Sequence, residues 1–163
     1  MTTIEQYEGL CWGDPPPDAT TLVRRCHELA RVHVANMEPG DLRLLLLQQI
    51  AVALLLGPAV QVLFRDPLIE GTWYPGDLLH AVLELDEQAW LDAGLAERAK
   101  ELAQRLTDPK IEAYLREHEH PRRVAERLDP IRAFIATWPA ERKVAKVRRG
   151  RKARMAKLKG RKR

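Results

Sequence analysis

A long apolar stretch between residues 42 and 62 constrains the fold of this 163-residue chain more than any other feature. Its first part, residues 42–56, is apolar on almost every side of a helix, so we expect a central helix covered by the rest of the protein. Gly57-Pro58 predicts the end of that helix and the start of a second one over residues 59–65, because proline is favoured in the first turn of a helix.

The same stretch has the length of a membrane span, since about 20 apolar residues cross a bilayer as a helix. Gln48 and Gln49 lie inside it, and amide side chains are costly to place in lipid. The N-terminal segment MTTIEQYEGL lacks the basic and apolar regions of a secretory signal. Cys11 and Cys26 do not form a CxxC pair and are expected as reduced thiols. These features together predict a cytoplasmic protein that has no contact with a membrane.

The composition favours helices, because 45% of the residues are hydrophobic but only 6% are aromatic, and leucine and alanine dominate. Thr3, Asp18 or Thr20, and Asp86 are candidate N-caps. We predict an all-α, compact multi-helix single domain around the central apolar helix, with a basic C-terminal tail. Further helices are expected over residues 3–10, 21–34, 78–85, 87–92, 95–106, 110–118, 122–128 and 129–138.

The net charge of +4 hides an uneven distribution along the chain. Residues 141–163 hold 13 Lys and Arg against the single acid Glu141, a net charge of +12, whereas residues 1–140 hold 14 Lys and Arg against 22 Asp and Glu, a net charge of −8. We therefore predict two parts, a helical domain over residues 1–140 and a basic tail over residues 141–163 that has too few apolar residues to form a core.

Three consecutive prolines interrupt the chain after Trp12, at residues 15–17. Proline removes a backbone donor and restricts φ, so neither a helix nor a central strand can continue through this segment. One interpretation is a strap across the domain with Trp12 as its anchor. The other is a polyproline ligand for a partner domain.

No motif of a known catalytic or metal site is present in the sequence. A glycine-rich phosphate loop, a nucleophile elbow and an HExxH motif are all absent. His118 and His120 form an HxH pair at the expected end of a helix, without further ligands nearby, and His27 is expected at a helix edge. The sequence therefore predicts a binding protein without metal or cofactor, rather than an enzyme.

Several motifs occur together, and in this order they resemble the immunity proteins of bacterial contact-dependent growth inhibition (CDI) systems. The most specific of these motifs is the last one, residues 74–79, which closes the turn-rich segment after residue 66. The resemblance covers about residues 5–105. The motifs are Trp12, Pro15-Pro16, Leu22-Val23-Arg24 with Cys26-His27, Asp41-Leu42-Arg43, Gln48 and Ile50, Pro67-Leu68 with Glu70-Gly71, and Tyr74-Pro75-Gly76-Asp77-Leu78-Leu79.

The sequence departs from the family pattern at a few positions. Leu47 and Ala51 stand where the resemblance leads us to expect glycine, and Gln49 stands in place of asparagine. Thr72-Trp73 replaces an acid followed by an aromatic residue, so a role of an acid at position 72 is not carried over to this chain.

The resemblance implies a small cytoplasmic protein that binds a toxin domain, delivered by a neighbouring cell or made by its own cell. It would block the toxin by occlusion or by trapping an inactive state, without catalysis. The acidic domain fits a basic toxin, because opposite charges steer association. The resemblance does not extend to the basic tail.

The loop that carries Glu70, Trp73, Tyr74 and Asp77 is the predicted toxin-binding site, because a turn-rich segment with aromatic and acidic side chains is typical of a contact surface. The structural alternative is that Trp73 and Tyr74 anchor the loop in the core and that Asp77 caps the following helix.

The tail supports a second hypothesis, in which Arg148, Arg149, Arg151, Lys152 and Arg154 contact nucleic acid or an acidic partner, such as the acidic domain of this protein itself. The remaining interpretation is a tail that increases solubility and binds nothing selectively. Such binding would weaken steeply with salt and would be weakly specific, because the tail has no aromatic residues on which bases could stack.

Overall fold

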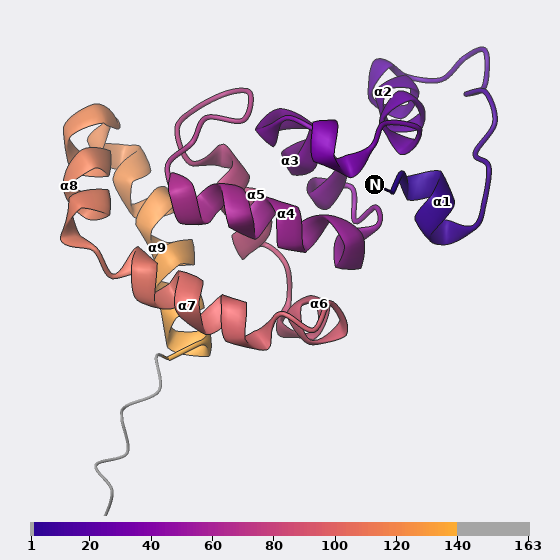
Figure 1. The fold of residues 1–163 in the computed structure, drawn as a ribbon. Helices are drawn as coiled ribbons and strands as arrows, with labels where there is room; N and C mark the ends of the chain where they lie inside the picture. Colours follow the sequence, from indigo (N-terminus) through magenta and orange to yellow (C-terminus); the bar gives the residue numbers. More distant parts are fainter. Residues whose placement is uncertain (1, 140–163) are drawn as a thin grey trace, which may run out of the picture.

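The computed structural model describes residues 2–139, and these residues form nine α-helices and one 3-10 helix (Figure 1). The predicted all-α class is therefore confirmed, whereas the predicted boundary at residue 140 lies outside the described part of the chain and stays a prediction. The elements are α1 (Ile4–Glu8), α2 (Thr21–Ala30), η1 (Val34–Asn36), α3 (Pro39–Leu47), α4 (Val52–Arg65), α5 (Asp77–Leu83), α6 (Glu87–Asp92), α7 (Ala96–Leu106), α8 (Pro109–His118) and α9 (Pro121–Thr137).

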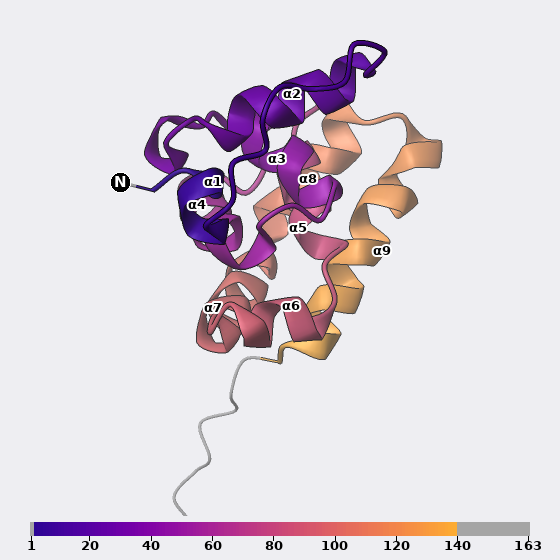
Figure 2. The same ribbon diagram turned by 90° about the vertical axis from the view of Figure 1, so that its right-hand side faces the viewer.

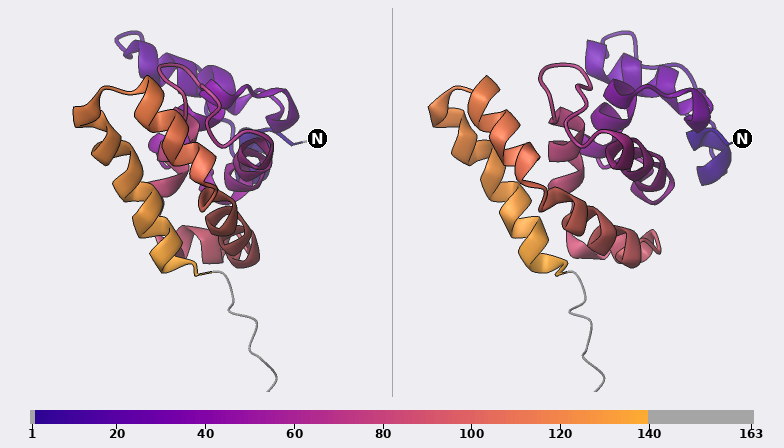
Figure 3. Two further views of the ribbon diagram at one scale, coloured as in Figure 1. Left: turned by 90° about the vertical axis from the view of Figure 1, so that its left-hand side faces the viewer. Right: turned by 60° about the vertical axis from the view of Figure 1, so that its left-hand side comes forward.

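Helices α3, α4 and α5 contact one another and form the centre of the molecule. Helices α1 and α2 pair at one end, and α8 lies at the other (Figure 1). The long helix α9 runs down one side and packs against α5, α7 and α8 (Figures 2 and 3). Within residues 2–139, no helix has both the length and the hydropathy needed to cross a bilayer.

The central apolar stretch does not form the predicted helix over residues 42–56. Helix α3 ends at Leu47, the chain turns through residues 48–51, and α4 then continues through Gly57-Pro58 to Arg65. A single helix would carry its leucines away from each other, whereas the turn brings the apolar faces of α3 and α4 together in one core. Both glutamines are exposed in this turn.

Two residues of the turn have a left-handed backbone, Gln49 with φ 57° and Ala51 with φ 46°. This conformation is unfavourable for residues with a side chain and favours glycine and asparagine. Gln49 and Ala51 are two of the positions where the sequence departs from the family pattern, in which asparagine and glycine are expected. The unfavourable backbone conformation therefore occurs at these departures.

Proline inside a helix explains two wrong boundaries. Pro58 lies within α4, and Pro130 lies within α9, which was expected as two separate helices. An internal proline costs about 3 kcal/mol or more. Fully burying one large apolar side chain contributes about 1.5–3 kcal/mol, and both helices bury several around their proline, so packing outweighs the break.

The predicted helix over residues 21–34 is also too long. It ends at Ala30 and is followed by η1, while Leu22 and Val23, expected on its apolar face, remain exposed. The local start signals were read correctly. Thr3, Thr20 and Asp86 each accept a hydrogen bond from the first turn of the helix that they precede.

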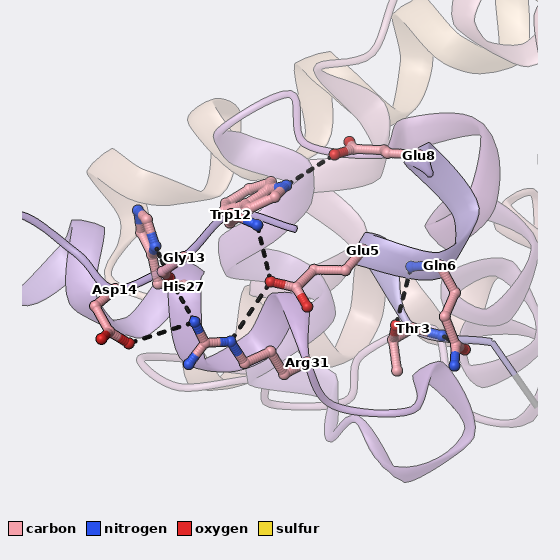
Figure 4. Close-up of polar contacts among 9 residues, drawn as sticks. All are labelled: Thr3, Glu5, Gln6, Glu8, Trp12, Gly13, Asp14, His27 and Arg31. Carbon is pink, nitrogen blue, oxygen red and sulfur yellow. Dashed lines mark hydrogen bonds and ion pairs between the residues drawn. The ribbon is translucent and has the colours of Figure 1, made fainter. Parts of the chain in front are cut away.

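Trp12 anchors the proline-containing segment to the body, as the strap interpretation predicts (Figure 4). Its main-chain N–H donates to Glu5 at 3.0 Å, and its indole N–H donates to Glu8 at 2.9 Å. Its ring lies edge-on to His27, and Arg31 of α2 lies 3.5 Å from the Glu5 carboxylate. Side chains of α1 and α2 thus hold the strap on both sides.

Helices α8 and α9 complete the hydrophobic core. Trp90 of α6 is fully buried, with its ring 5.3 Å from that of Phe134 and 6.3 Å from that of Trp138. Leu128 and Ile131 of α9 belong to the same cluster. The hydrophobic core therefore includes residues well beyond residue 105, where the resemblance ends.

Candidate functional site

The loop between α4 and α5, residues 66–76, carries all but one of the predicted contact residues, and the last, Asp77, is the first residue of α5. We call this segment the Trp73 loop. It rises between α3 on one side and α8 and α9 on the other (Figures 1 and 3). An isolated bridge between Glu70 and Pro75 closes its tip.

A buried carboxylate holds the backbone of the Trp73 loop. Asp77 is 1% exposed and accepts hydrogen bonds from three consecutive main-chain N–H groups, those of Gly71 at 2.5 Å, Thr72 at 2.9 Å and Trp73 at 2.9 Å. Arg43 of α3 adds an ion pair, with its Nε 3.2 Å from Oδ2. A carboxylate with this many donors is satisfied within the protein and is not free to contact a partner.

Two glycines allow the loop to come this close to the body. A Cβ on Gly40 would lie 2.6 Å from the carbonyl oxygen of Gly71 and 2.7 Å from Oγ1 of Thr72. A Cβ on Gly71 would lie 2.7 Å from Oδ1 of Asp77. All three distances are too short for carbon, so the loop can dock on α3 only because these two positions lack a side chain.

Trp73 is the most exposed large hydrophobic residue of the described chain, at 72% exposure. Its backbone is held by Asp77 while its indole points to solvent. Glu70 is exposed on the same loop. Trp73 is therefore not a core anchor, which was the structural alternative for this residue.

Tyr74 packs against the body instead. The guanidinium carbon of Arg127 lies 3.5 Å from the centre of the Tyr74 ring, and the Tyr74 hydroxyl lies 3.2 Å from Nδ1 of His80. Burial lowers the pKa of His80, and the nearby charge of Arg127 lowers it further. A neutral His80 is consistent with its position between the tyrosine and a cation.

The structure thus brings the four predicted site residues together but places them differently. Glu70 and Trp73 face solvent, Tyr74 is half-buried, and Asp77 lies beneath the loop. Asp77 does not serve as the N-cap of α5, because its carboxylate bonds to the loop and Gly76 occupies the cap position.

Sequence reasoning gave no role to Gly40, Arg43 or Arg127. A charged Arg43 within an apolar stretch was a usable signal, because a buried charge requires a partner. Arg127 lies more than 50 residues from Tyr74, and no local pattern relates the two. The five predicted tail residues, Arg148, Arg149, Arg151, Lys152 and Arg154, lie outside the described residues.

The Trp73 loop exposes an aromatic ring and a carboxylate, those of Trp73 and Glu70. Among residues 2–139, no group of three or more His, Cys, Asp or Glu could hold a metal ion. The backbone of the loop is held by Asp77, and tryptophan is a residue type enriched among those that dominate protein interfaces.

Comparison with known protein families identifies the chain. The model of a family described as CDI immunity proteins matches residues 6–101, which is more than half of the chain and includes the Trp73 loop. Searches of curated proteins and of solved structures found no significant match. The chain therefore belongs to the immunity proteins of contact-dependent growth inhibition, non-catalytic inhibitors that bind and neutralise a cognate toxin.

Proposed function

We propose that the Trp73 loop is the surface that binds the cognate toxin, with Glu70 and Trp73 in contact and with Tyr74 and Asp77 holding the loop in place. One observation carries the proposal: a tryptophan that is 72% exposed has its own main-chain N–H fixed by a buried carboxylate. Tryptophan is enriched among the residues that dominate binding energy, and a loop ordered before binding loses little entropy when the complex forms.

The charge of the protein supports a basic partner. Residues 1–140 carry a net charge of −8, and Glu70 lies exposed beside Trp73. Opposite charges accelerate the encounter of two proteins, while a central aromatic residue contributes most to the lifetime of the complex. The toxin would then present a basic surface with an apolar recess for the indole.

Neutralisation follows from coverage of the toxin. The immunity protein occludes a functional surface of the toxin in the cytoplasm, where both proteins meet. No bond is made or broken, so the degree of protection depends on affinity and concentration alone.

The test begins with the full chain, tagged, and captures the toxin from nuclease-treated lysate of the native bacterium at about 150 mM salt, where surface charges are screened beyond about 8 Å. A parallel capture with residues 1–140 measures what the basic tail adds. The captured protein is cloned, and its toxic domain is expressed to arrest growth. Protection by the immunity protein and by its variants is then measured, together with Kd.

Trp73→Ala should weaken toxin binding by about 30-fold or more, the effect of a dominant interface residue, while the melting temperature stays unchanged. Glu70→Lys should slow association. Tyr7→Ala, which removes a half-exposed aromatic ring on α1, is the matched control and should leave both Kd and protection unchanged. If Trp73→Ala binds the toxin with full affinity, the interface lies elsewhere on the protein.

A further inference from the structure

The Trp73 loop has a second tether that comes from the other end of the chain. Asp77 holds the amides of residues 71–73, whereas Tyr74 is held by Arg127, a residue of α9. The two contacts hold adjacent residues, because Asp77 accepts from the Trp73 amide and Arg127 lies over the ring of Tyr74. A loop held by only one of these contacts could still rotate about that contact.

Arg127 is fixed on several sides. Its side chain is only 14% exposed, its Nε lies 3.7 Å from a carboxylate oxygen of Glu119, and its Nη1 lies 3.2 Å from Nδ1 of His80. The flat guanidinium lies over the Tyr74 ring at 3.5 Å. This geometry uses both the planar shape and the permanent charge of arginine, which lysine does not reproduce.

The residues that hold Arg127 come from two parts of the chain. His80 lies within the family-matched segment, residues 6–101, whereas Glu119 and Arg127 belong to the helical hairpin that follows it. Leu115 and Ile131 of the same hairpin line a small cavity together with Leu68 of the loop and Leu79 of α5, and α5 packs against α9.

We infer that Arg127 is a positioning residue for the Trp73 loop, so that helices α8 and α9 set the orientation in which the loop meets the toxin. The inference rests on the proposed function of the loop. The inference adds that side chains outside the family-matched segment influence the affinity of the protein for the toxin without touching the toxin.

The experiment has two measurements on the full chain. Amide hydrogen exchange is measured by NMR without toxin, and the affinity for the toxin is measured separately. Arg127→Met removes the charge and the planar group but keeps an apolar side chain of similar length. We expect exchange of the Gly71, Thr72 and Trp73 amides to accelerate roughly 5- to 30-fold, and toxin affinity to fall by a similar factor. Amides of α4 should keep their protection, which a general loss of stability would not allow.

Two further variants serve as a control and as a test of the planar group. Arg123→Met removes an exposed arginine one turn earlier on α9 and should change neither loop exchange nor toxin affinity. Arg127→Lys keeps a positive charge near Glu119 and should restore only part of the loop protection. Wild-type exchange and affinity in Arg127→Met would overturn the inference.

The outcomes separate this inference from the proposed function. If Trp73→Ala binds the toxin normally, the loop is not the interface, whatever Arg127 does to its amides. If Trp73→Ala loses binding while Arg127→Met retains both loop protection and affinity, the loop is the interface and Arg127 does not position it.

Discussion

The Nε atom of Arg43 lies 3.2 Å from the buried carboxylate of Asp77, and this ion pair joins α3 to α5 directly beneath the Trp73 loop. The same carboxylate accepts the three loop amides, so one side chain connects two helices and the loop. A buried charge of this kind is favourable only while all its partners are present. Its value here is that it orders the loop in a single conformation.

We expect Asp77→Asn to lower the free energy of unfolding by about 3 kcal/mol, because it leaves Arg43 without its counter-charge and replaces one of the two oxygens that accept the loop amides with an NH2 donor. Urea denaturation measures the change. Asp108→Asn is the control, since asparagine caps a helix as well as aspartate does, and its effect should be close to zero. Equal effects of the two substitutions would show that Asp77 acts as an ordinary cap.

Ala51→Gly should stabilise the protein by about 1 kcal/mol, because Ala51 has φ 46° and glycine adopts this conformation without strain. The same substitution at Ala53, exposed one residue inside α4, should destabilise by about 1 kcal/mol, the ordinary cost of glycine in a helix. Opposite shifts in the urea midpoint are the expected result. A loss of stability in both variants would argue against a left-handed residue 51.

Gly40→Ala should displace the Trp73 loop, since the added Cβ would lie 2.6 Å from the Gly71 carbonyl oxygen. We expect lower stability, by about 1–3 kcal/mol, and weaker toxin binding. Gly57→Ala is the comparison, because outside its chain neighbours its Cβ would meet only Leu95, at an ordinary 3.9 Å. It should leave the loop in place, and the usual gain from alanine in a helix is opposed there by Pro58, which disfavours a helical backbone at the preceding residue. Chemical shifts of the loop amides should move in the first variant and not in the second.

Acidification should lower the free energy of unfolding, because His80 takes up a proton more readily in the unfolded chain than in the folded protein. Burial, followed by the charge of Arg127, lowers the pKa of His80 below its ordinary value near 6.5. As the pH falls below that value, the unfolded chain takes up a proton before the folded protein does. The stability that is fully present above pH 6.5 is therefore lost as the pH falls towards the lowered pKa.

The measurement is the urea midpoint of the wild type and of His80→Gln between pH 7.5 and 5. The variant should lose less stability over this range than the wild type. His118→Gln, at an exposed position on α8, should follow the wild-type curve. A wild type and a His80→Gln variant with parallel curves would remove His80 as the source of the pH dependence.

Local signals predicted the helices well where the chain interacts mainly with its own neighbours. Asp86 shows this clearly, because its carboxylate accepts from the N–H of Ala89 at 2.8 Å as an N-cap should. Asp77 is also an acid at the start of a helix, as the first residue of α5, yet its carboxylate accepts from the loop amides. An acid at the start of a helix predicts a cap at both positions. Only Asp77 lies beneath a loop that folds back onto it, and this difference is not visible in the sequence.

The sequence by itself determined the helical class, most helix starts, the loop of interest and the family, because capping, apolar periodicity and a recurring motif are properties of neighbouring residues. The tertiary structure decided where the central stretch turns, why Pro58 and Pro130 lie within helices, and which side chains of the Trp73 loop face solvent. Those outcomes depend on burial and on partners such as Arg43 and Arg127, which approach the loop only when the chain has packed.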